Sequence, residues 1–190
     1  GSEKRIRLVP TRWAITATDD MLGRLLIKKI RNYPEINEIR VFSGEAMGNH
    51  FEIILLPGRF YFELVEIWMP RDWISKTIIE ADREDERGKK EYSSLSGGYY
   101  AARLPVLEYL EGERRCASII AIREIRPSYW APLGVWVVRE AARKTMKGRW
   151  KRFERIEDAL EEVRKNLRTP ESLWKGKIEF LKRRTIFDFS

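Results

Sequence analysis

Acidic residues in the first third of the chain are of the type that binds magnesium or manganese in nucleases. Such sites gather two to four carboxylates around the metal, where they activate water and stabilise the leaving oxygen. Asp19, Asp20 and Glu63 are the candidates, with Glu45 and Glu52 as further donors. Their spacing matches no nuclease signature, and Asp19 or Asp20 is equally explained as the cap of a following helix. A nuclease would lose a metal-dependent activity, and keep its fold, in Asp19→Ala or Glu63→Ala.

The chain holds one histidine and one cysteine, which limits other chemistry. A single cysteine excludes internal disulfides and multi-cysteine zinc sites and is typical of a reducing compartment. Cys116 lies in an apolar run and is expected to be buried, whereas His50 fits either a structural role or a ligand. Neither a P-loop nor a dinucleotide fingerprint is present. We therefore expect no cofactor in this fragment, except a divalent metal if it is a nuclease.

Four arginines interrupt otherwise apolar stretches, and an arginine in such a place needs a carboxylate, a carbonyl or a bound anion. They are Arg12, Arg103, Arg123 and Arg139. One interpretation is internal ion pairing with Asp19, Asp20 or Glu63. The other is a phosphate pocket completed by the amides of Gly97 and Gly98 at a helix start.

The positive charge is concentrated in the C-terminal third. Residues 143–184 hold 15 basic and 7 acidic residues, which accounts for the whole net charge of +8. Arg149, Trp150, Lys151 and Arg152 place cations around an aromatic ring, a combination that suits phosphate attraction with base stacking. A solvated, ion-paired face is the alternative, because glutamates follow at helical spacing.

Periodicity predicts the elements that position these residues. An amphipathic helix is expected over 21–33, three strands as an antiparallel meander over 36–70, and a mobile loop or extended hairpin over 76–98. A helix over 100–115, starting or bending near Leu104 because of Pro105, precedes a central strand over 116–125. Three further helices are expected over 133–146, 156–167 and 171–184. Strands and helices are segregated, so the expected class is α+β with a mainly antiparallel sheet, followed by a helical C-terminal extension and a short flexible tail.

We expect a core domain over 3–148, a basic helical extension over 149–182 and a tail over 183–190. Apolar runs are far shorter than the ~20 residues that cross a bilayer, which predicts no membrane partner and a cytoplasmic location. Gly1 and Ser2 look like residues left by cloning, so the natural protein is expected to begin upstream.

Three blocks of sequence have a long and distinctive wording: LVPTRWAITATDD from Leu8, GGYYAARLPVLEYLE from Gly97, and IREIRPSYWAPLGVWVVREAAR from Ile122. Together they resemble the archaeal Nre family of DNA-repair proteins, in its C-terminal part. The resemblance implies a role in DNA repair at the nucleoid, with DNA and the sliding clamp PCNA as partners. It implies a zinc-binding, cysteine-containing region in a missing N-terminal part. No catalytic residue comes with it, which favours a non-catalytic factor and leaves enzymatic activity open.

The resemblance also implies a PCNA-interacting (PIP) motif in the last residues, KRRTIFDFS. In such peptides a short 3₁₀ turn gathers an aliphatic and aromatic side chains for an apolar pocket. Ile186 aligns as the aliphatic residue and Phe189 as the first aromatic, with Thr185, Phe187 and Asp188 between and around them. Arg183 stands where the motif has glutamine, and Ser190 where it has a second large residue. The alternative is that the tail docks on its own domain.

Overall fold

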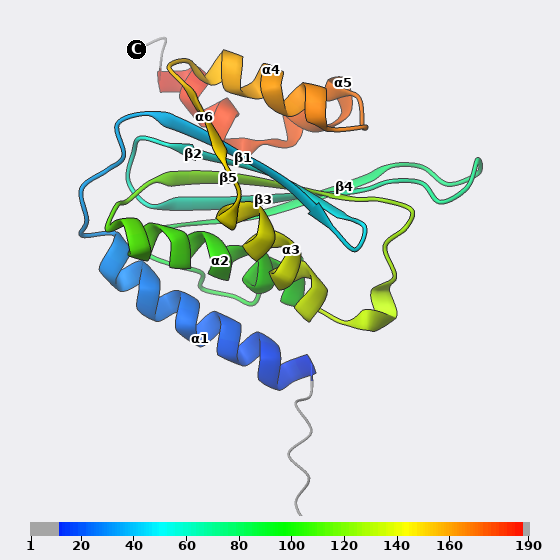
Figure 1. Cartoon of the computed structure of the whole chain (residues 1–190), viewed down its shortest axis with the longest axis horizontal. Helices are drawn as coiled ribbons and strands as arrows, with labels where there is room; N and C mark the ends of the chain where they lie inside the picture. The colour runs from blue at the N-terminus through cyan, green and yellow to red at the C-terminus, as the bar shows by residue number, and fades with distance from the viewer. Residues whose placement is uncertain (1–11, 188–190) are drawn as a thin grey trace, which may run out of the picture.

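The computed structural model describes residues 12–187 and their side chains from Ala14 to Arg184. A six-stranded sheet lies between two helical layers (Figure 1). The elements are α1 (Arg12–Ile30), β1 (Ile39–Ala46), β2 (Asn49–Leu56), β3 (Tyr61–Trp68), β4 (Ile78–Asp85), α2 (Gly97–Glu113), β5 (Ser118–Ile125), η1 (Ala131–Leu133), α3 (Trp136–Lys147), β6 (Trp150–Phe153), α4 (Ile156–Asn166), α5 (Glu171–Trp174), η2 (Lys175–Lys177) and α6 (Glu179–Phe187). None of the described helices is both long and apolar enough to span a membrane.

The strand order is β4-β3-β5-β2-β1-β6, and every neighbouring pair is antiparallel except β3 with β5. The expected α+β class is therefore confirmed. The expected central strand is β5, which is buried at all eight positions. The meander is wrong beyond the β1–β2 hairpin, because β5 inserts between β2 and β3. All three are buried along almost their whole length, which is typical of interior strands in a sheet that is covered on both faces.

The stretch expected as a mobile loop or hairpin contains an edge strand, β4, paired with β3 along its whole length. Its acidic residues alternate with apolar ones, so Glu80, Asp82 and Glu84 point to one face of the sheet while Ile79 and Ala81 pack on the other. α2 begins at Gly97 and continues through Pro105, so the alternative of a helix start near Leu104 is wrong.

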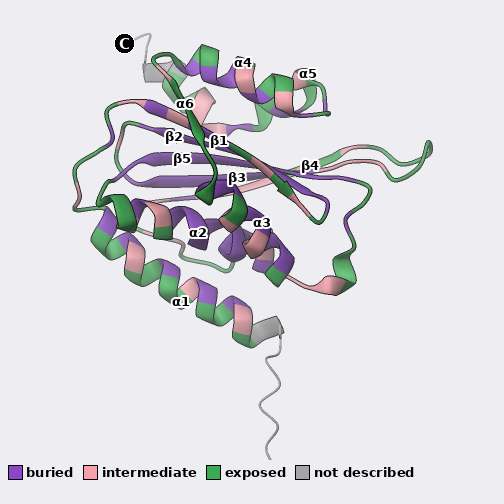
Figure 2. Cartoon of the chain, in the orientation of Figure 1, coloured by how far each residue is buried: buried purple, intermediate pink, exposed green. Residues whose placement is uncertain are grey.

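Two separate hydrophobic cores hold the layers together (Figure 2). On one face Phe62 and Leu64 of β3 pack with α1, α2 and α3. On the other, Val65 and Ile67 of the same strand pack with α4, Trp174 and Ile178. β3 thus contributes side chains to both cores, because successive side chains of a strand point to opposite faces of the sheet.

The segment expected as a basic helical extension begins with a strand, since Trp150 to Phe153 pairs with the outer edge of β1. The helices that follow then cover the second face of the sheet. Trp174 and Ile178 are fully buried there, which fixes α5 and the start of α6 to the sheet.

Candidate functional site

A layer of ion pairs lies between α1, α2, α3 and the sheet. Arg103 of α2 is 1% exposed and donates to Glu84 Oε1 (2.5 Å) and Asp20 Oδ1 (3.1 Å). The Tyr99 hydroxyl donates to the same Glu84 oxygen (2.8 Å). Arg139 of α3 donates to Asp19 Oδ1 (2.7 Å). These pairs join three helices and the edge strand, so they position elements that lie far apart in sequence.

Arg123 lies at the centre of the sheet and is buried. Its guanidinium group donates to Glu66 and, from Nε, to Asn49 Oδ1 (2.8 Å). The guanidinium carbon Cζ of Arg123 lies 5.8 Å from the centre of the Trp68 ring and 5.2 Å from that of the Tyr129 ring. Burial raises the pKa of Glu66, an effect that the charge of Arg123 opposes.

The two glycines that begin α2 permit close packing. A Cβ on Gly97 would lie 2.7 Å from Thr16 Oγ1 of α1. A Cβ on Gly98 would lie 3.3 Å from Arg123 Nη1 and 3.4 Å from Glu66 Oε2. Glycine at these positions therefore brings the helix start onto α1 and onto the central ion pair.

Three of the four arginines singled out for phosphate binding are thus held by carboxylates. Asp19 and Asp20 were among the expected partners, whereas Glu66 and Glu84 were not. The side chains of Arg103 and Arg123 are buried together with these carboxylates, whereas that of Arg139 remains 24% exposed. The side chain of the fourth, Arg12, lies outside the described residues.

The three carboxylates considered for a nuclease site lie on opposite faces of the sheet. Asp19 and Asp20 face the α1–α3 layer, whereas Glu63 is fully buried below α6. Its oxygens accept from the backbone amides of Glu179 (2.7 Å) and Phe180 (3.0 Å) and from the Tyr61 hydroxyl (2.6 Å). Glu63 therefore caps α6. Within residues 12–187, no group of three or more His, Cys, Asp or Glu is placed to hold a metal ion.

His50 and Cys116 are both buried. His50 Nε2 lies 2.8 Å from Glu52 Oε2, and that carboxylate also accepts from Ser43 Oγ (2.9 Å) and Asn166 Nδ2 (2.9 Å). The cluster ties the β1–β2 hairpin to the end of α4. Burial raises the pKa of the Cys116 thiol to about 11, which keeps it protonated and unreactive near neutral pH.

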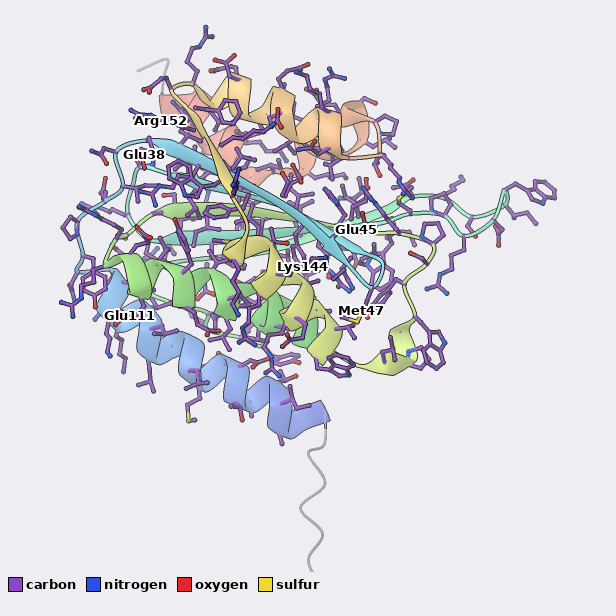
Figure 3. The ribbon with its side chains drawn as sticks, viewed as in Figure 1. Glu38, Glu45, Met47, Glu111, Lys144 and Arg152 are labelled. Atoms are coloured by element: carbon purple, nitrogen blue, oxygen red, sulfur yellow. The ribbon has the colours of Figure 1, made fainter. Side chains whose placement is uncertain are left out.

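The cluster around Trp150 forms a basic surface at the β6 edge of the sheet. Arg149, Lys151 and Arg152 are exposed, and the Arg40 guanidinium group lies 4.6 Å from the Trp150 ring centre. Lys151 pairs with Glu162 (2.5 Å) and Arg152 with Glu154 (3.1 Å), and the Lys151 and Arg152 side chains remain about two-thirds exposed. The surface continues onto α3, where Lys144 reaches the Glu45 carbonyl oxygen (2.9 Å; Figure 3).

The last described helix carries the residues expected to bind the clamp. Arg183 is exposed, lies 3.7 Å from a Glu179 oxygen and 5.8 Å from the Tyr61 ring centre. Thr185, Ile186 and Phe187 form the end of α6, but their side chains lie outside the described residues, as does the whole of Phe189. A hollow of about 650 Å³ beside α6 is lined by Phe180 and by four arginines, Arg59, Arg87, Arg183 and Arg184.

Comparison with known proteins places the chain in a family. Residues 84–189 match the family model described as archaeal Nre, C-terminal, and residues 1–74 match the one described as archaeal Nre, N-terminal. DNA repair protein NreA of Archaeoglobus fulgidus is 51% identical over 162 residues, which cover 84% of this chain and 41% of NreA. NreB of the same organism is 40% identical over 189 residues, covering 96% of this chain and 48% of NreB.

DNA repair protein NreA of Haloferax volcanii is 38% identical over 170 residues, which cover 86% of this chain and 40% of that protein. The chain thus spans less than half the length of these curated relatives. No solved structure matches it. The C-terminal family model alone covers more than half of the chain. The resemblance of the three sequence blocks is therefore confirmed, and this chain belongs to the archaeal Nre family.

Proposed function

We propose that this chain is the part of a DNA-repair factor that contacts DNA through the basic β6 surface and binds the sliding clamp through its C-terminal tail. The repair role rests on the names of its relatives, NreA and NreB. The DNA contact is supported by one observation above the others: a run of exposed cations lies at the β6 edge of the sheet, whereas Arg103, Arg123 and Arg139 are paired with carboxylates.

The basic surface fits a phosphate backbone. Residues 143–155 contain seven basic residues and one acidic residue. Because side chains alternate along a strand, Trp150 and Arg152 lie on one side of β6 and Lys151 on the other. The surface ion pairs of Lys151 with Glu162 and of Arg152 with Glu154 contribute at most about 1 kcal/mol each. Phosphates can therefore replace the two glutamates at little cost.

The clamp contact is supported by how α6 is held. Its first turn is capped by Glu63, and Phe180 packs on Tyr61 with the ring centres 5.3 Å apart. The residues aligned with the clamp-binding motif therefore follow directly from a fixed base. A contact of so few residues should be weak, of about micromolar strength, because ordering a short peptide costs free energy.

Salt-dependent binding tests the DNA contact. Duplex affinity of the wild type should fall steeply with salt, and an Arg149→Ala/Lys151→Ala/Arg152→Ala variant should lose about 2 to 3 units of the log–log slope. A Lys175→Ala/Lys177→Ala variant, on the η2 turn, removes exposed charge elsewhere and is the matched control. An unchanged slope in the triple variant would contradict the assignment of this surface.

Calorimetric titration of the cognate sliding clamp tests the tail. We expect saturable binding that an Ile186→Ala/Phe189→Ala variant loses without a change in thermal stability. If the wild type does not bind the clamp and the Ile186→Ala/Phe189→Ala variant is less stable, the tail is instead part of the folded core.

A further inference from the structure

The loop between β3 and β4 projects from the end of the sheet (Figure 1) and has an apolar tip. At this tip Trp73 is 93% exposed and Ile74 is 72% exposed. Large apolar side chains displayed side by side to this degree are unusual on a soluble surface and indicate a contact with another molecule. Neither residue packs on the core, so stability of the fold does not explain them.

The tip is held in a defined turn. Asp72 Oδ1 accepts hydrogen bonds from the amides of Ile74 (3.0 Å) and Ser75 (2.7 Å) and from the Ser75 hydroxyl (2.7 Å). These bonds engage the one negative charge of the tip and fix the backbone that presents the two apolar side chains. A preorganised tip loses less conformational entropy when it binds.

The base of the loop is tied to a second aromatic loop. Arg71 Nη2 donates to the Tyr129 carbonyl oxygen (2.6 Å), and the Trp68 and Tyr129 rings meet edge to face. The residues after Tyr129 display two more indole rings, with Trp130 60% and Trp136 42% exposed. One end of the molecule therefore presents three exposed tryptophans, two on the connected loops and one at the start of α3.

The charge around the tip favours nucleic acid as the partner. Arg71 and Lys76, both exposed, flank the apolar pair and outnumber the single carboxylate of the tip, Asp72. An apolar side chain between cations is the arrangement of wedges that enter a base step while neighbouring cations hold the phosphates. A stable protein interface needs about 1,200 to 2,000 Å² of buried surface, much more than two side chains provide.

We propose that Trp73 and Ile74 form a wedge that enters DNA where bases are unpaired or poorly stacked. This inference rests on the DNA contact proposed above and adds the DNA structure recognised. Opening a paired step costs several kcal/mol, whereas an unpaired base is already free to stack on the indole ring. The chain should therefore bind a duplex with an internal unpaired region more tightly than a perfect duplex of the same length.

The test compares the two DNAs with wild type, Trp73→Ala, Trp73→Phe and Tyr92→Ala. A 2-aminopurine in the unpaired region reports stacking. Trp73→Ala should weaken binding to the unpaired region by about fivefold or more and abolish the fluorescence change. Perfect-duplex affinity should not change, and Trp73→Phe should retain part of the preference. Tyr92, 58% exposed on the β4–α2 loop, is the matched aromatic control and should behave as wild type.

Because Trp73 is so exposed, its replacement should leave the melting temperature unchanged, and a loss of binding then reports a lost contact. The wedge is overturned if the wild type binds both DNAs with equal affinity. It is also overturned if Trp73→Ala keeps the full preference for the DNA with the unpaired region. In both cases the proposed DNA contact stands. A wild type that binds neither DNA overturns the proposed DNA contact and the wedge together. If Trp73→Ala keeps its preference for the DNA with the unpaired region but no longer binds a protein partner, the wedge is overturned in favour of a protein contact.

Discussion

Replacement of Glu63 by alanine should destabilise the fold and loosen α6. The carboxylate is fully buried and accepts three hydrogen bonds, two from the first amides of α6 and one from the Tyr61 hydroxyl. Loss of a helix cap costs about 1 kcal/mol. A buried hydroxyl left without its acceptor costs about 1 to 3 kcal/mol more. We therefore expect a total of about 3 kcal/mol.

For a chain of this size 1 kcal/mol corresponds to about 2 to 4 °C in melting temperature, so Glu63→Ala should melt about 6 to 12 °C lower. Thermal unfolding followed by circular dichroism measures this shift. Hydrogen exchange should show faster exchange of the Glu179 and Phe180 amides. Glu80→Ala, at an exposed position of the same sheet, is the control and should stay within about 0.5 kcal/mol of wild type.

A Glu63→Ala variant with wild-type stability and unchanged exchange in α6 would refute the capping role. If such a variant also lost a divalent-metal-dependent activity, it would favour the nuclease alternative raised by the sequence. The two outcomes separate a structural from a catalytic carboxylate at this position.

Glu124→Gln should flatten the acid side of the stability profile. Burial alone would raise the pKa of Glu124, but hydrogen bonds from Thr169 and the preceding amide lower it below its ordinary value of 4.5. The stabilisation is therefore complete above that value and lost as pH falls through the lower folded pKa, which urea unfolding between about pH 3 and 6 will show. Gly44→Ala should cost about 1 to 3 kcal/mol, measured by the urea midpoint, because its Cβ would lie 2.9 Å from the Thr145 Cα. Cys116 should react with a thiol reagent only after denaturation, and fast reaction of the native chain would show that the thiol is not buried as described.

Local patterns were sufficient for most elements of the fold. The run SIIAIREI is apolar on both faces, which predicts a central strand, and β5 is one. The neighbours of β5 could not be predicted in this way. β2 and β3 carry the same pattern, so hydrophobicity does not distinguish a hairpin between them from a sheet in which β5 separates them. β4 was not distinguished within a stretch expected as a mobile loop or an extended hairpin, because its acidic residues suggest a solvated segment, whereas their partners Arg103 and Lys89 come from outside the strand.

The same limit applies to the candidate site. The arginines could be expected to need partners, and Asp19 and Asp20 were correctly considered. Glu66 and Glu84 could not be predicted as the carboxylate partners of Arg123 and Arg103. The strand order of the sheet and the packing of α2 bring these residues together, and neither can be read from local sequence. Trp73 and Ile74 resemble a core dipeptide in sequence, and only the length and direction of their loop place them in solvent.

The position of β5 has a consequence for how the chain folds during synthesis. β1, β2 and β3 lie within residues 1–74, which match the N-terminal family model, whereas β5 and β6 lie within the part that matches the C-terminal one. The β1–β2 hairpin can form as soon as it leaves the ribosome. β2 and β3, however, each keep one edge with unpaired backbone groups until β5 has been translated and inserted between them.

Contacts between residues so distant in sequence slow folding, because the intervening chain must first be ordered. During that interval, two strands with unpaired edges are available to pair with other chains. Expression of residues 1–74 alone should therefore give aggregates rather than a domain. The segments that match the two family models contribute strands to one sheet, so the nascent chain is expected to depend on chaperones until β5 emerges.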